Sequence, residues 1–518
     1  MHRPIHLPVL SSSPNTPNPR ALPLQARSDE LSSYEKKEKC GVVGLWGIPE
    51  AASLAYLGLY AQQHRGQESA GLAVSDGQTL RAHTGMGLVP EVLDGPTVAK
   101  LDAHVAAAKP GQGGGGGAIG HNRYSTAGGS LECNAQPLLE SFVGGQVALA
   151  HNGNLINADA FRAQFEKAGH LFHTTSDTEV IIHLLASPSQ QQTPDPLAAT
   201  LRHLEGAFSL VFLFKDRLEA ARDPWGWRPL VLGQFPSGHY CVASETVALE
   251  VMGANYLREI EPGEIVTISD KGLSTRRYAE RSVPAAHCVF EHVYFAHPAS
   301  NVFGQNVQLT REAFGERLSI EHPVEADFIV PMPDSGRSAA VGYARHSKIP
   351  LREAIVPNRY VGRTFIRPTP QQRQAAVRLK LNVISEIVRG KRLIIVDDSI
   401  VRGTTTRAKI QQIRNAGALE IHLRISCPPI RHPCFFGVDF ATRDQLIASG
   451  KTVEQIREFL GVDSLGYLSL EGMLSCVNRP AGSWCTACYS GDYRLDVEHP
   501  TTEEIVPPPL TQQQRIFS

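Results

Sequence analysis

The sequence predicts a chain of two mixed domains, a β-rich layered α+β domain followed by an α/β domain with a parallel sheet. The length of 518 residues favours two or more domains. The hydrophobic content of 42% is ample for ordinary packed cores. Near residue 285, short apolar runs broken by Gly, Pro and Asn give way to strands that alternate with amphipathic helices. This alternation implies a parallel sheet with helices on its faces.

The composition excludes several classes of function. The formal net charge of −1 predicts neither a basic surface for nucleic acid nor an acidic tail. No apolar run approaches the roughly 20 residues that cross a bilayer, so we expect a soluble, cytoplasmic protein without a membrane partner. The nine cysteines are an odd number in a long chain, which argues against a secreted disulfide framework. Metal binding, catalysis and burial remain as their roles.

The predicted boundaries divide the chain into four parts. Residues 1–39 are an extension or propeptide whose first 25 residues are rich in Pro and Ser and contain no acid. Two interpretations are open, a disordered extension (or an early start codon) and an organellar transit peptide, and the first is favoured. Residues 40–272 form the first domain and residues 273–490 the second. Residues 491–518 are polar and Pro-rich, as in a flexible tail.

In the first domain, apolar runs predict strands and two longer stretches predict helices. The strands are Val42–Trp46, Ala118–Tyr124, Val147–His151, Phe208–Phe214 and Leu230–Leu232, and the helices are Ala51–His64 and Asp177–Ser187. The glycine run 113–117 predicts a hairpin tip. In the second domain the predicted strands are Asp327–Val330, Leu393–Val396 and Ile421–Ile425, with helices after Ser335 and Thr404 and a mobile loop at 360–380.

The sharpest motif runs from Leu393 to Thr406, with the sequence LIIVDDSIVRGTTT. A buried parallel strand ends in two carboxylates, at the edge where open α/β sheets bind ligands. A Gly-Thr-Thr turn then opens a helix, whose N-terminal N–H groups form a cup for phosphate. Adjacent Asp side chains suit ribose hydroxyls, directly or through Mg²⁺. The alternative, a strand followed by an Asp N-cap, explains only one of the two acids.

This segment resembles the phosphoribosylpyrophosphate (PRPP) signature of type I phosphoribosyltransferases. The resemblance implies that the acids contact the ribose hydroxyls and that the turn holds the 5′-phosphate. The implied PRPP ligands are Asp397, Asp398, Ser399, Arg402, Gly403, Thr404 and Thr405. The loop 331–336 resembles the family's pyrophosphate loop, which adds Ser335 to Asp397 and Asp398 as ligands of one Mg²⁺ per subunit. The stretch 358–381, with Arg359 and Lys380, is a candidate basic lid over the pyrophosphate. Alone, the loop 331–336 is a weak signal because its sequence also suits an ordinary turn, and the stretch 358–381 alone favours a solvated basic loop.

The first domain carries an ordered set of short motifs. They are CGVVG from Cys40, HRGQESAG from His64, GHNRYST from Gly120, HNGN from His151, TSDTE from Thr175 and RDP from Arg222. Together these motifs resemble the class II glutamine amidotransferase domain, an N-terminal-nucleophile hydrolase with αββα layers. A lone Cys40 would more often be a buried thiol of a strand.

The chemistry of that class needs a thiolate that attacks an unreactive carboxamide. If the residues before Cys40 are removed, its α-amino group, with a pKa of about 8, accepts the thiol proton. No catalytic His is then needed, so His64, His121 and His151 are predicted to be structural. The resemblance implies that Asn152 and Gly153 stabilise the oxyanion.

The resemblance also implies which residues bind the α-carboxylate and the α-ammonium of glutamine. The sequence departs from the family pattern at two positions. Arg123 binds the α-carboxylate, with Arg65 as a weaker candidate, and Asp177 binds the α-ammonium. Lys39 stands where the family usually has an acid before the nucleophile, which bears on the efficiency of self-cleavage. Trp227 replaces an Ile, which predicts a packing change.

Cys485 and Cys488 form a Cys-x-x-Cys pair, which suggests metal or redox chemistry. Two unrelated thiols near a chain end are the alternative for the pair alone. The iron–sulfur branch of the amidotransferase family has matching positions at Cys288 and Cys434. The resemblance therefore implies one structural [4Fe–4S] cluster per subunit on these four cysteines, and zinc on the same thiolates is the physical alternative. The resemblance does not include Cys427 among the ligands.

Over residues 40–490 the chain resembles the amidophosphoribosyltransferase family. The resemblance implies conversion of PRPP, glutamine and water to 5-phosphoribosylamine, glutamate and pyrophosphate, the first step of de novo purine (IMP) biosynthesis. It also implies a homotetramer inhibited by purine nucleotides. Two rivals are a different class II amidotransferase, which the 397–405 motif argues against, and a PRPP- or nucleotide-binding regulator on the same fold. A regulator would need neither an intact nucleophile nor the residues that bind glutamine.

Overall fold

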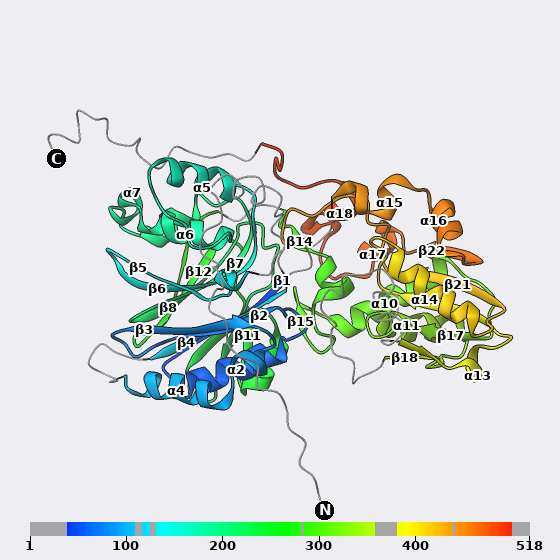
Figure 1. Ribbon diagram of the computed structural model, residues 1–518, viewed down its shortest axis with the longest axis horizontal. Helices are drawn as coiled ribbons and strands as arrows, with labels where there is room; N and C mark the ends of the chain where they lie inside the picture. The colour runs from blue at the N-terminus through cyan, green and yellow to red at the C-terminus, as the bar shows by residue number, and fades with distance from the viewer. Residues whose placement is uncertain are drawn as a thin grey trace, which may run out of the picture. The chain divides into compact units, whose positions relative to one another are not determined.

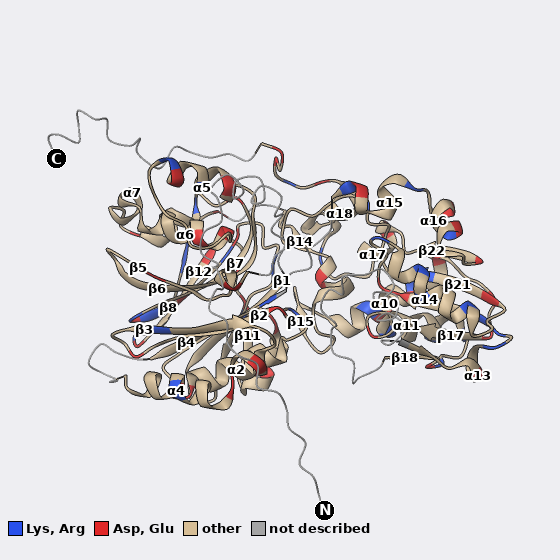
Figure 2. Cartoon of the chain, viewed as in Figure 1, with Lys and Arg blue, Asp and Glu red and all other residues tan. Residues whose placement is uncertain are grey.

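The computed structural model describes residues 39–108, 116–124, 131–280, 284–357, 381–438 and 442–499 (Figure 1). All of these residues belong to one compact unit. The predicted lid residues Arg359 and Lys380, the extension before Lys39 and most of the predicted glycine hairpin tip lie outside the described residues. Acidic and basic side chains are interspersed along the described chain (Figure 2), in keeping with the net charge of −1.

Two antiparallel sheets fill the first part of the chain. The seven-stranded sheet has the order β11-β9-β10-β1-β4-β2-β3, and the six-stranded sheet has the order β13-β12-β8-β7-β6-β5. The first comprises β1 (Lys39–Trp46), β2 (Ser69–Ser75), β3 (Leu80–Met86), β4 (Gly117–Tyr124), β9 (Val231–Gln234), β10 (Tyr240–Ala243) and β11 (Asn255–Glu259). The second comprises β5 (Leu138–Phe142), β6 (Gly145–Leu155), β7 (Gly206–Phe214), β8 (Arg217–Arg222), β12 (Glu264–Ser269) and β13 (Gly272–Arg277).

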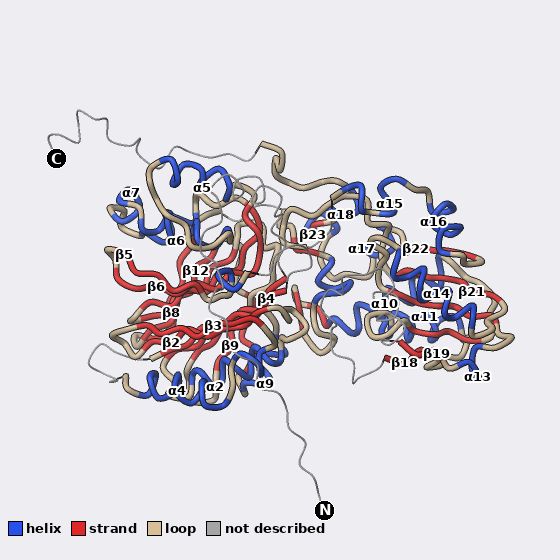
Figure 3. Tube along the Cα trace, viewed as in Figure 1, coloured by secondary structure: helices blue, strands red, loops and turns tan. Residues whose placement is uncertain are grey.

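The two sheets pack face to face through a fully buried apolar core. Val42 of the first sheet and Ala150 and Val211 of the second belong to one cluster. Helices cover the outer faces, as the two strand layers between helices show in Figure 3. One face carries α2 (Ala51–Ala61), α3 (Val89–Val92), α4 (Gly95–Ala106) and α9 (Thr246–Met252), and the other carries α5 (Ala158–Lys167), α6 (Asp177–Ala186), α7 (Pro188–Gln191) and α8 (Pro196–Leu201). The predicted αββα layering is confirmed.

The second part of the chain is built on a four-stranded parallel sheet with the order β17-β20-β21-β22. Its strands are β17 (Phe328–Pro331), β20 (Arg392–Asp397), β21 (Glu420–Ile425) and β22 (Ser464–Tyr467). The apolar run Leu393–Val396 of β20 is fully buried, because a central parallel strand is covered on both faces. The longer helices are α10 (Val307–Glu321), α11 (Arg337–Ser347), α14 (Thr404–Asn415) and α16 (Val453–Leu460).

Shorter elements complete the description. Two-stranded pairs are β14 (His287–Cys288) with β23 (Trp484–Cys485), β15 (Asn301–Val302) with β16 (Gln305–Asn306), and β18 (Ile355–Pro357) with β19 (Leu381–Val383). Short helical turns are η1 (Glu132–Asn134), the π-helical η2 (Glu291–Phe295), α13 (Ser385–Val388), η3 (Arg443–Gln445), α15 (Ile447–Gly450), α17 (Leu470–Leu474), η4 (Ala481–Ser483) and α18 (Ala487–Ser490).

The chain beyond residue 490 differs from the predicted flexible tail in its first residues. The Tyr493 hydroxyl donates to the carbonyl oxygen of Pro433 (2.8 Å). Leu495 and Val497 pack against a cluster that contains Phe436 and Cys485. These side chains supply the apolar area that holds the segment down, and residues 500–518 lie outside the described part of the chain.

Two glycines let α10 and α11 cross closely. A Cβ at Gly342 would collide with the carbonyl oxygen of Glu312, and a Cβ at Gly315 would collide with that of Ala339. Both obstacles are backbone atoms of the facing helix, so no side-chain rotation relieves them. Since α11 also contacts β17 and β20, this crossing supports the sheet that carries the predicted phosphate motif.

We predict that Gly342→Ala destabilises the protein by about 1–3 kcal/mol, because overpacking at a helix crossing forces the backbones apart. The matched control is Gly450→Ala, whose added Cβ meets no atom within 4 Å and which should leave stability unchanged or slightly raised. Thermal unfolding followed by intrinsic fluorescence compares the two variants. Equal unfolding temperatures would show that the crossing tolerates a methyl group.

Candidate active site

Strand pairing brings the predicted nucleophile and one predicted glutamine ligand together. Cys40 lies at the start of β1, and its register partner on β4 is Arg123. Arg123 also pairs with Ser69 of β2 on its other side. Cys40 is fully buried and Arg123 is 7% exposed. The central position of β4 thus holds a guanidinium beside the thiol.

The predicted oxyanion residues lie on β6 in the facing sheet. Asn152 is fully buried, and its side-chain amide has no hydrogen-bond partner among the described residues. A buried amide without a partner is costly unless a ligand supplies one. Gly153 has a φ of +157°, and a Cβ there would collide with the carbonyl oxygen of Ala207. Only glycine therefore fits beside Asn152.

Asp177 lies at the start of α6, against the end of β6. Its Oδ2 accepts a hydrogen bond from the Leu155 backbone N–H (2.9 Å), and its Oδ1 lies 3.6 Å from Nδ1 of His151. The carboxylate is thus held near the Asn152–Gly153 end of the strand. His121 Nε2–H donates to the carbonyl oxygen of His151 (3.1 Å) and links the two sheets. Burial lowers the pKa of His121 to about 3, so this ring is neutral, which agrees with a structural role.

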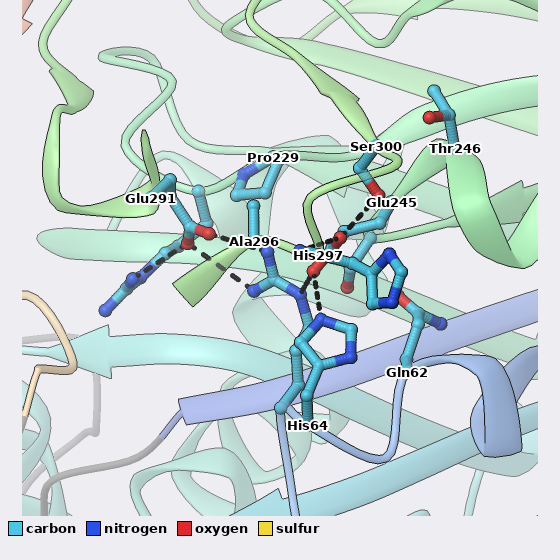
Figure 4. A network of polar contacts seen from close by, with 12 residues as sticks. Gln62, His64, Pro229, Glu245, Thr246, Glu291, Ala296, His297 and Ser300 are labelled. Carbon is cyan, nitrogen blue, oxygen red and sulfur yellow. Dashed lines mark hydrogen bonds and ion pairs between the residues drawn. The ribbon is translucent and has the colours of Figure 1, made fainter. Parts of the chain in front are cut away.

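The structure places Arg65 in a buried ion-pair network with Glu245 and Glu291, the two carboxylates labelled in Figure 4. Its Nε contacts Glu245, and its Nη2 lies 2.6 Å from Oε2 of Glu291. Oε1 of Glu291 in turn lies 3.1 Å from Nη1 of Arg228. Both edges of the Arg65 guanidinium are therefore directed at protein carboxylates. That Arg65 contacts glutamine stays a prediction. Because its guanidinium already faces two protein carboxylates, the geometry is in keeping with Arg65 as a weaker candidate than Arg123.

Glu245 accepts hydrogen bonds from three further donors of the network (Figure 4). It accepts from His64 Nε2 (2.8 Å), the His297 backbone N–H (2.8 Å) and the Ser300 hydroxyl (2.6 Å). Burial raises the pKa of Glu245, but Arg65 and His64 more than offset this and hold it well below its usual range. Burial likewise lowers the pKa of Arg65, and Glu245 and Glu291 more than offset that effect. Both groups are thus charged.

The sequence did not reveal Glu245, Glu291 or Arg228 as site residues. They are separated by more than 15 residues from one another and from Arg65 and lie in no shared motif. Arg228 follows the Arg-Asp-Pro motif by only a few residues, which was the one available signal. Their burial, at 2% exposure or less, becomes visible only in the folded chain.

The predicted phosphate site is assembled at the carboxyl end of β20. Asp397 ends the strand, and its Oδ1 accepts from the backbone N–H of Asp398 (3.0 Å). Gly403 adopts a left-handed conformation with a φ of +75° and directly precedes α14, which favours glycine at this turn. Burial and then repulsion from Asp398 raise the pKa of Asp397. The ligand-free carboxyl pair therefore tends to keep a proton.

One cavity of about 880 Å³ connects the two halves of the described chain. Its walls include His64, Arg65 and Gln67 from the first part of the chain, and Tyr294 and Arg311 from the second. The predicted PRPP and magnesium residues with described positions also line it: Ser335, Asp397, Asp398, Ser399, Arg402, Gly403, Thr404 and Thr405. The predicted PRPP site therefore opens toward His64, Arg65 and Gln67 of the first domain, and of the predicted glutamine residues only Arg65 lines this cavity.

The four predicted cluster cysteines converge near the ends of β14 and β23. Cys288 and Cys485 are register partners of these parallel strands. The Cys488 carbonyl accepts from the backbone N–H of Arg431 (2.9 Å), three residues before Cys434. Burial and then the neighbouring Cys434, Cys485 and Cys288 raise the pKa of the Cys488 thiol. Within the described ranges, no three His, Cys, Asp or Glu side chains stand arranged to hold a metal ion.

These features define a class of protein. A cysteine at the head of a central strand, an amide–glycine pair and an aspartate at the start of a helix in αββα layers are the arrangement of a class II glutamine amidotransferase. The acid pair and Gly-Thr-Thr turn at the edge of a parallel sheet add a phosphate-binding domain. None of the helices in the described ranges has the length and apolar character that a membrane crossing requires.

Comparison with known proteins narrows the class to one family. The family model described as a glutamine amidotransferase domain matches residues 121–251. The amidophosphoribosyltransferase of Methanothermobacter thermautotrophicus is 46% identical over 89% of this chain and 96% of its own. The chloroplastic amidophosphoribosyltransferase 1 of Arabidopsis thaliana is 43% identical over 93% of this chain and 83% of its own. The chain belongs to the amidophosphoribosyltransferase family.

A solved structure extends this result to the fold. The glutamine PRPP amidotransferase of Bacillus subtilis, in complex with ADP and GMP, superposes with a TM-score of 0.80 at 42% identity. The match covers 90% of this chain and 99% of that one. The predicted combination of an N-terminal-nucleophile glutaminase domain with a phosphoribosyltransferase domain is confirmed.

We predict that Glu291→Ala destabilises the protein by about 3–5 kcal/mol, because it removes a carboxylate that two buried guanidinium groups share. The control is Glu454→Ala, which breaks an exposed pair with Arg457 on α16 and should have no measurable effect. Chemical denaturation of both variants gives the comparison. A Glu291→Ala protein as stable as the control would show that the network contributes nothing to folding.

Proposed function

We propose that this protein is an amidophosphoribosyltransferase that converts PRPP, glutamine and water to 5-phosphoribosylamine, glutamate and pyrophosphate. This reaction is the first step of de novo purine biosynthesis. The observation that carries the proposal is the shared cavity, which joins the Asp397–Thr405 loop to His64, Arg65 and Gln67 of the glutaminase domain. The family membership and the B. subtilis structure support it.

Glutamine hydrolysis begins at Cys40. After removal of the preceding residues, the α-amino group of Cys40 accepts the thiol proton, and the thiolate attacks the carboxamide carbon. The Asn152 amide N–H and the Gly153 backbone N–H donate to the oxyanion. Arg123 pairs with the α-carboxylate and Asp177 with the α-ammonium. Ammonia leaves with the proton, and water hydrolyses the thioester to glutamate.

The second half-reaction takes place at the carboxyl end of β20. Asp397 and Asp398 orient the ribose hydroxyls, while Arg402, Gly403 and the Thr404–Thr405 turn at the start of α14 hold the 5′-phosphate. Mg²⁺, held near Ser335 and the two acids, would neutralise charge on the departing pyrophosphate. Ammonia displaces the pyrophosphate at C1 with inversion. Arg359 and Lys380 are proposed to close over the pyrophosphate and exclude water.

A route inside the protein is proposed for ammonia. Free ammonia in water is protonated near neutral pH and loses its nucleophilic lone pair. The cavity places His64, Arg65 and Gln67 of the glutaminase domain on the same walls as Asp397, which supports direct transfer.

The thiols of Cys288, Cys434, Cys485 and Cys488, which lie near one another, are the proposed ligands of a [4Fe–4S] cluster. The donor set consists of thiols alone, and Cys485 and Cys488 are each 8% exposed, as a solvent-protected cluster requires. Arg228 supports this assignment, because Cys288 and Cys434 lie close enough to raise its pKa, against the lowering by burial. We assign the cluster a structural role in tying residues 484–499 to the rest of the chain. About four irons per chain in an anaerobic preparation would support the iron–sulfur cluster. Stoichiometric zinc would show that zinc is bound by these cysteines instead.

The assembly and regulation are also proposals. The B. subtilis relative was solved with ADP and GMP bound, which supports purine nucleotides as inhibitors here. A homotetramer and a cytoplasmic location are proposed, and the chloroplastic relatives of Arabidopsis keep a transit peptide open as the role of the extension before Lys39.

We predict that Cys40→Ala lowers glutamine-dependent formation of phosphoribosylamine by about 10³-fold or more, because the nucleophile is lost. Activity with a high concentration of ammonia should remain, since the phosphoribosyltransferase site is untouched. The matched control is Cys241→Ala on β10, because burial raises the pKa of that thiol to about 12 and makes it a poor nucleophile. Glutamate and pyrophosphate release are measured with and without PRPP.

Equimolar, PRPP-dependent release by the wild type supports the coupled reaction. Glutamate release that is indifferent to PRPP would instead indicate another acceptor. No release from protein whose intact mass begins at Cys40 would favour the PRPP- or nucleotide-binding regulator. Retained glutamine use by Cys40→Ala would remove Cys40 as the nucleophile.

We predict that binding of Mg²⁺ with PRPP releases protons at neutral pH. Because burial and Asp398 raise the pKa of Asp397 in the ligand-free protein, a cation that favours the ionised form lowers this pKa and expels the proton. Affinity should therefore increase as the pH rises toward the raised pKa. Calorimetry in buffers of different ionisation enthalpy counts the protons, and Asp397→Asn should abolish their release. Unchanged release in that variant would place the proton elsewhere.

A further inference from the structure

Trp227 occupies a rigid turn beside the cysteine cluster. Asp223 Oδ1 accepts hydrogen bonds from the backbone N–H groups of Trp225 (2.9 Å) and Gly226 (2.6 Å). The Arg222 guanidinium donates to the carbonyl oxygens of Gly226 (2.8 Å) and Arg228 (2.7 Å). The turn therefore has little freedom to move.

The same turn is joined to the strand that carries a cluster cysteine. The backbone N–H of Cys288 donates to the carbonyl oxygen of Trp227 (3.2 Å), and that of Ala286 donates to the carbonyl of Trp225 (2.8 Å). The Trp227 backbone is thus hydrogen-bonded to the backbone of Cys288, whose side chain is one of the proposed iron ligands.

The indole ring packs against the segments that carry two more of the cysteines. It is fully buried and stacks on Phe436, with ring centroids 4.3 Å apart and planes inclined by 20°. The backbone N–H of Phe436 in turn donates to Sγ of Cys434 (3.4 Å). Trp227, Phe436 and Cys485 belong to one buried cluster, with Cys434 packed against it. The side chain of Trp227, which stands where the family has an Ile, therefore packs among the residues around Cys434 and Cys485.

The indole N–H has no ordinary acceptor. Nε1 of Trp227 is buried and has no hydrogen-bond partner among the described residues, which is an unfavourable state for a donor in a folded protein. Cys485 belongs to the same small buried cluster as Trp227, and Cys434 packs against that cluster, so these two sulfurs are the candidate acceptors near the indole. Neither sulfur accepts a hydrogen bond from Nε1 of Trp227 in this structure.

We propose that Trp227 donates its indole N–H to sulfur at the Cys485 side of the occupied iron–sulfur cluster and stabilises the reduced cluster. This inference rests on the cluster proposed above. A thiolate bound to iron carries more negative charge than a thiol, so it is a better acceptor and completes the bond. Hydrogen bonds to the sulfurs and exclusion of water set the reduction potential of such clusters. Trp227 is a positioning residue that acts on the cluster and takes no part in either half-reaction.

The test compares Trp227→Phe, which keeps a stacked ring but lacks the N–H, with the matched control Trp225→Phe. Trp225 is a half-buried indole of the same turn, with its ring 5.6 Å from that of Trp227. Iron content is measured first on anaerobically purified full-length protein. We expect the reduction potential of the Trp227→Phe cluster to become more negative, with faster loss of visible absorbance in air, and both properties of Trp225→Phe to match the wild type.

A spectroscopic measurement on the wild type decides the contact even if Trp227→Phe assembles no cluster. Protein labelled with ¹⁵N at the indole nitrogen is reduced, and pulsed electron paramagnetic resonance detects ¹⁵N and exchangeable-hydrogen couplings to the cluster. Couplings present in the wild type and in Trp225→Phe support the proposal. Their absence from the reduced wild type, or an unchanged potential in Trp227→Phe, would overturn it. Protein without iron would overturn the cluster and this contact together, while the Cys40→Ala experiment tests the glutamine reaction separately.

Discussion

Two carboxylates and two guanidinium groups without access to water constrain how this chain folds. Glu245 and Glu291 are fully buried, and Arg65 and Arg228 are at most 3% exposed. Each charge is tolerable only because the others are in place. Arg65 precedes β2, Glu245 precedes α9, and Glu291 begins the π-helical turn η2. Arg228 precedes β9, so satisfying the set fixes four separate segments at once, beside the cavity that the Asp397–Thr405 loop lines.

The glutaminase residues depend on the strand register in a similar way. Arg123 is placed beside Cys40 by the pairing of β1 with β4, and a slip of one residue would turn Arg123 to the other face of the sheet. Gly153 is equally constrained, since the carbonyl of Ala207 on the neighbouring strand leaves no room for a side chain. The chemistry of the amidotransferase class thus follows from a sheet whose register has few alternatives.

Much of this could be predicted from the sequence, because periodicity and short motifs are local. The strand Leu393–Val396 and the helix after Thr404 were predicted from such patterns and are present, and the αββα layers that the resemblance implied are present as well. Asn152 is buried and Cys288 is the register partner of Cys485, while the roles that the resemblance assigns to them stay predictions. The carboxylate partners of Arg65 could not be predicted, since a Glu in an unremarkable segment gives no sign of the guanidinium it will face. The packing of Leu495 and Val497 was missed because a polar, Pro-rich composition masks two apolar contacts.

The position of Glu291 also bears on how separable the two halves of the protein are. A fragment that ended at the predicted boundary near residue 272 would contain Arg65, Arg228 and Glu245 but not Glu291. It would expose two guanidinium groups that in the whole chain share that acid. The glutaminase is thus not a self-sufficient module, and recombining it with an unrelated acceptor domain would require that domain to bring its own carboxylate to the same place. Gene fusion or domain exchange in this architecture is limited by one buried side chain rather than by the length or flexibility of a linker.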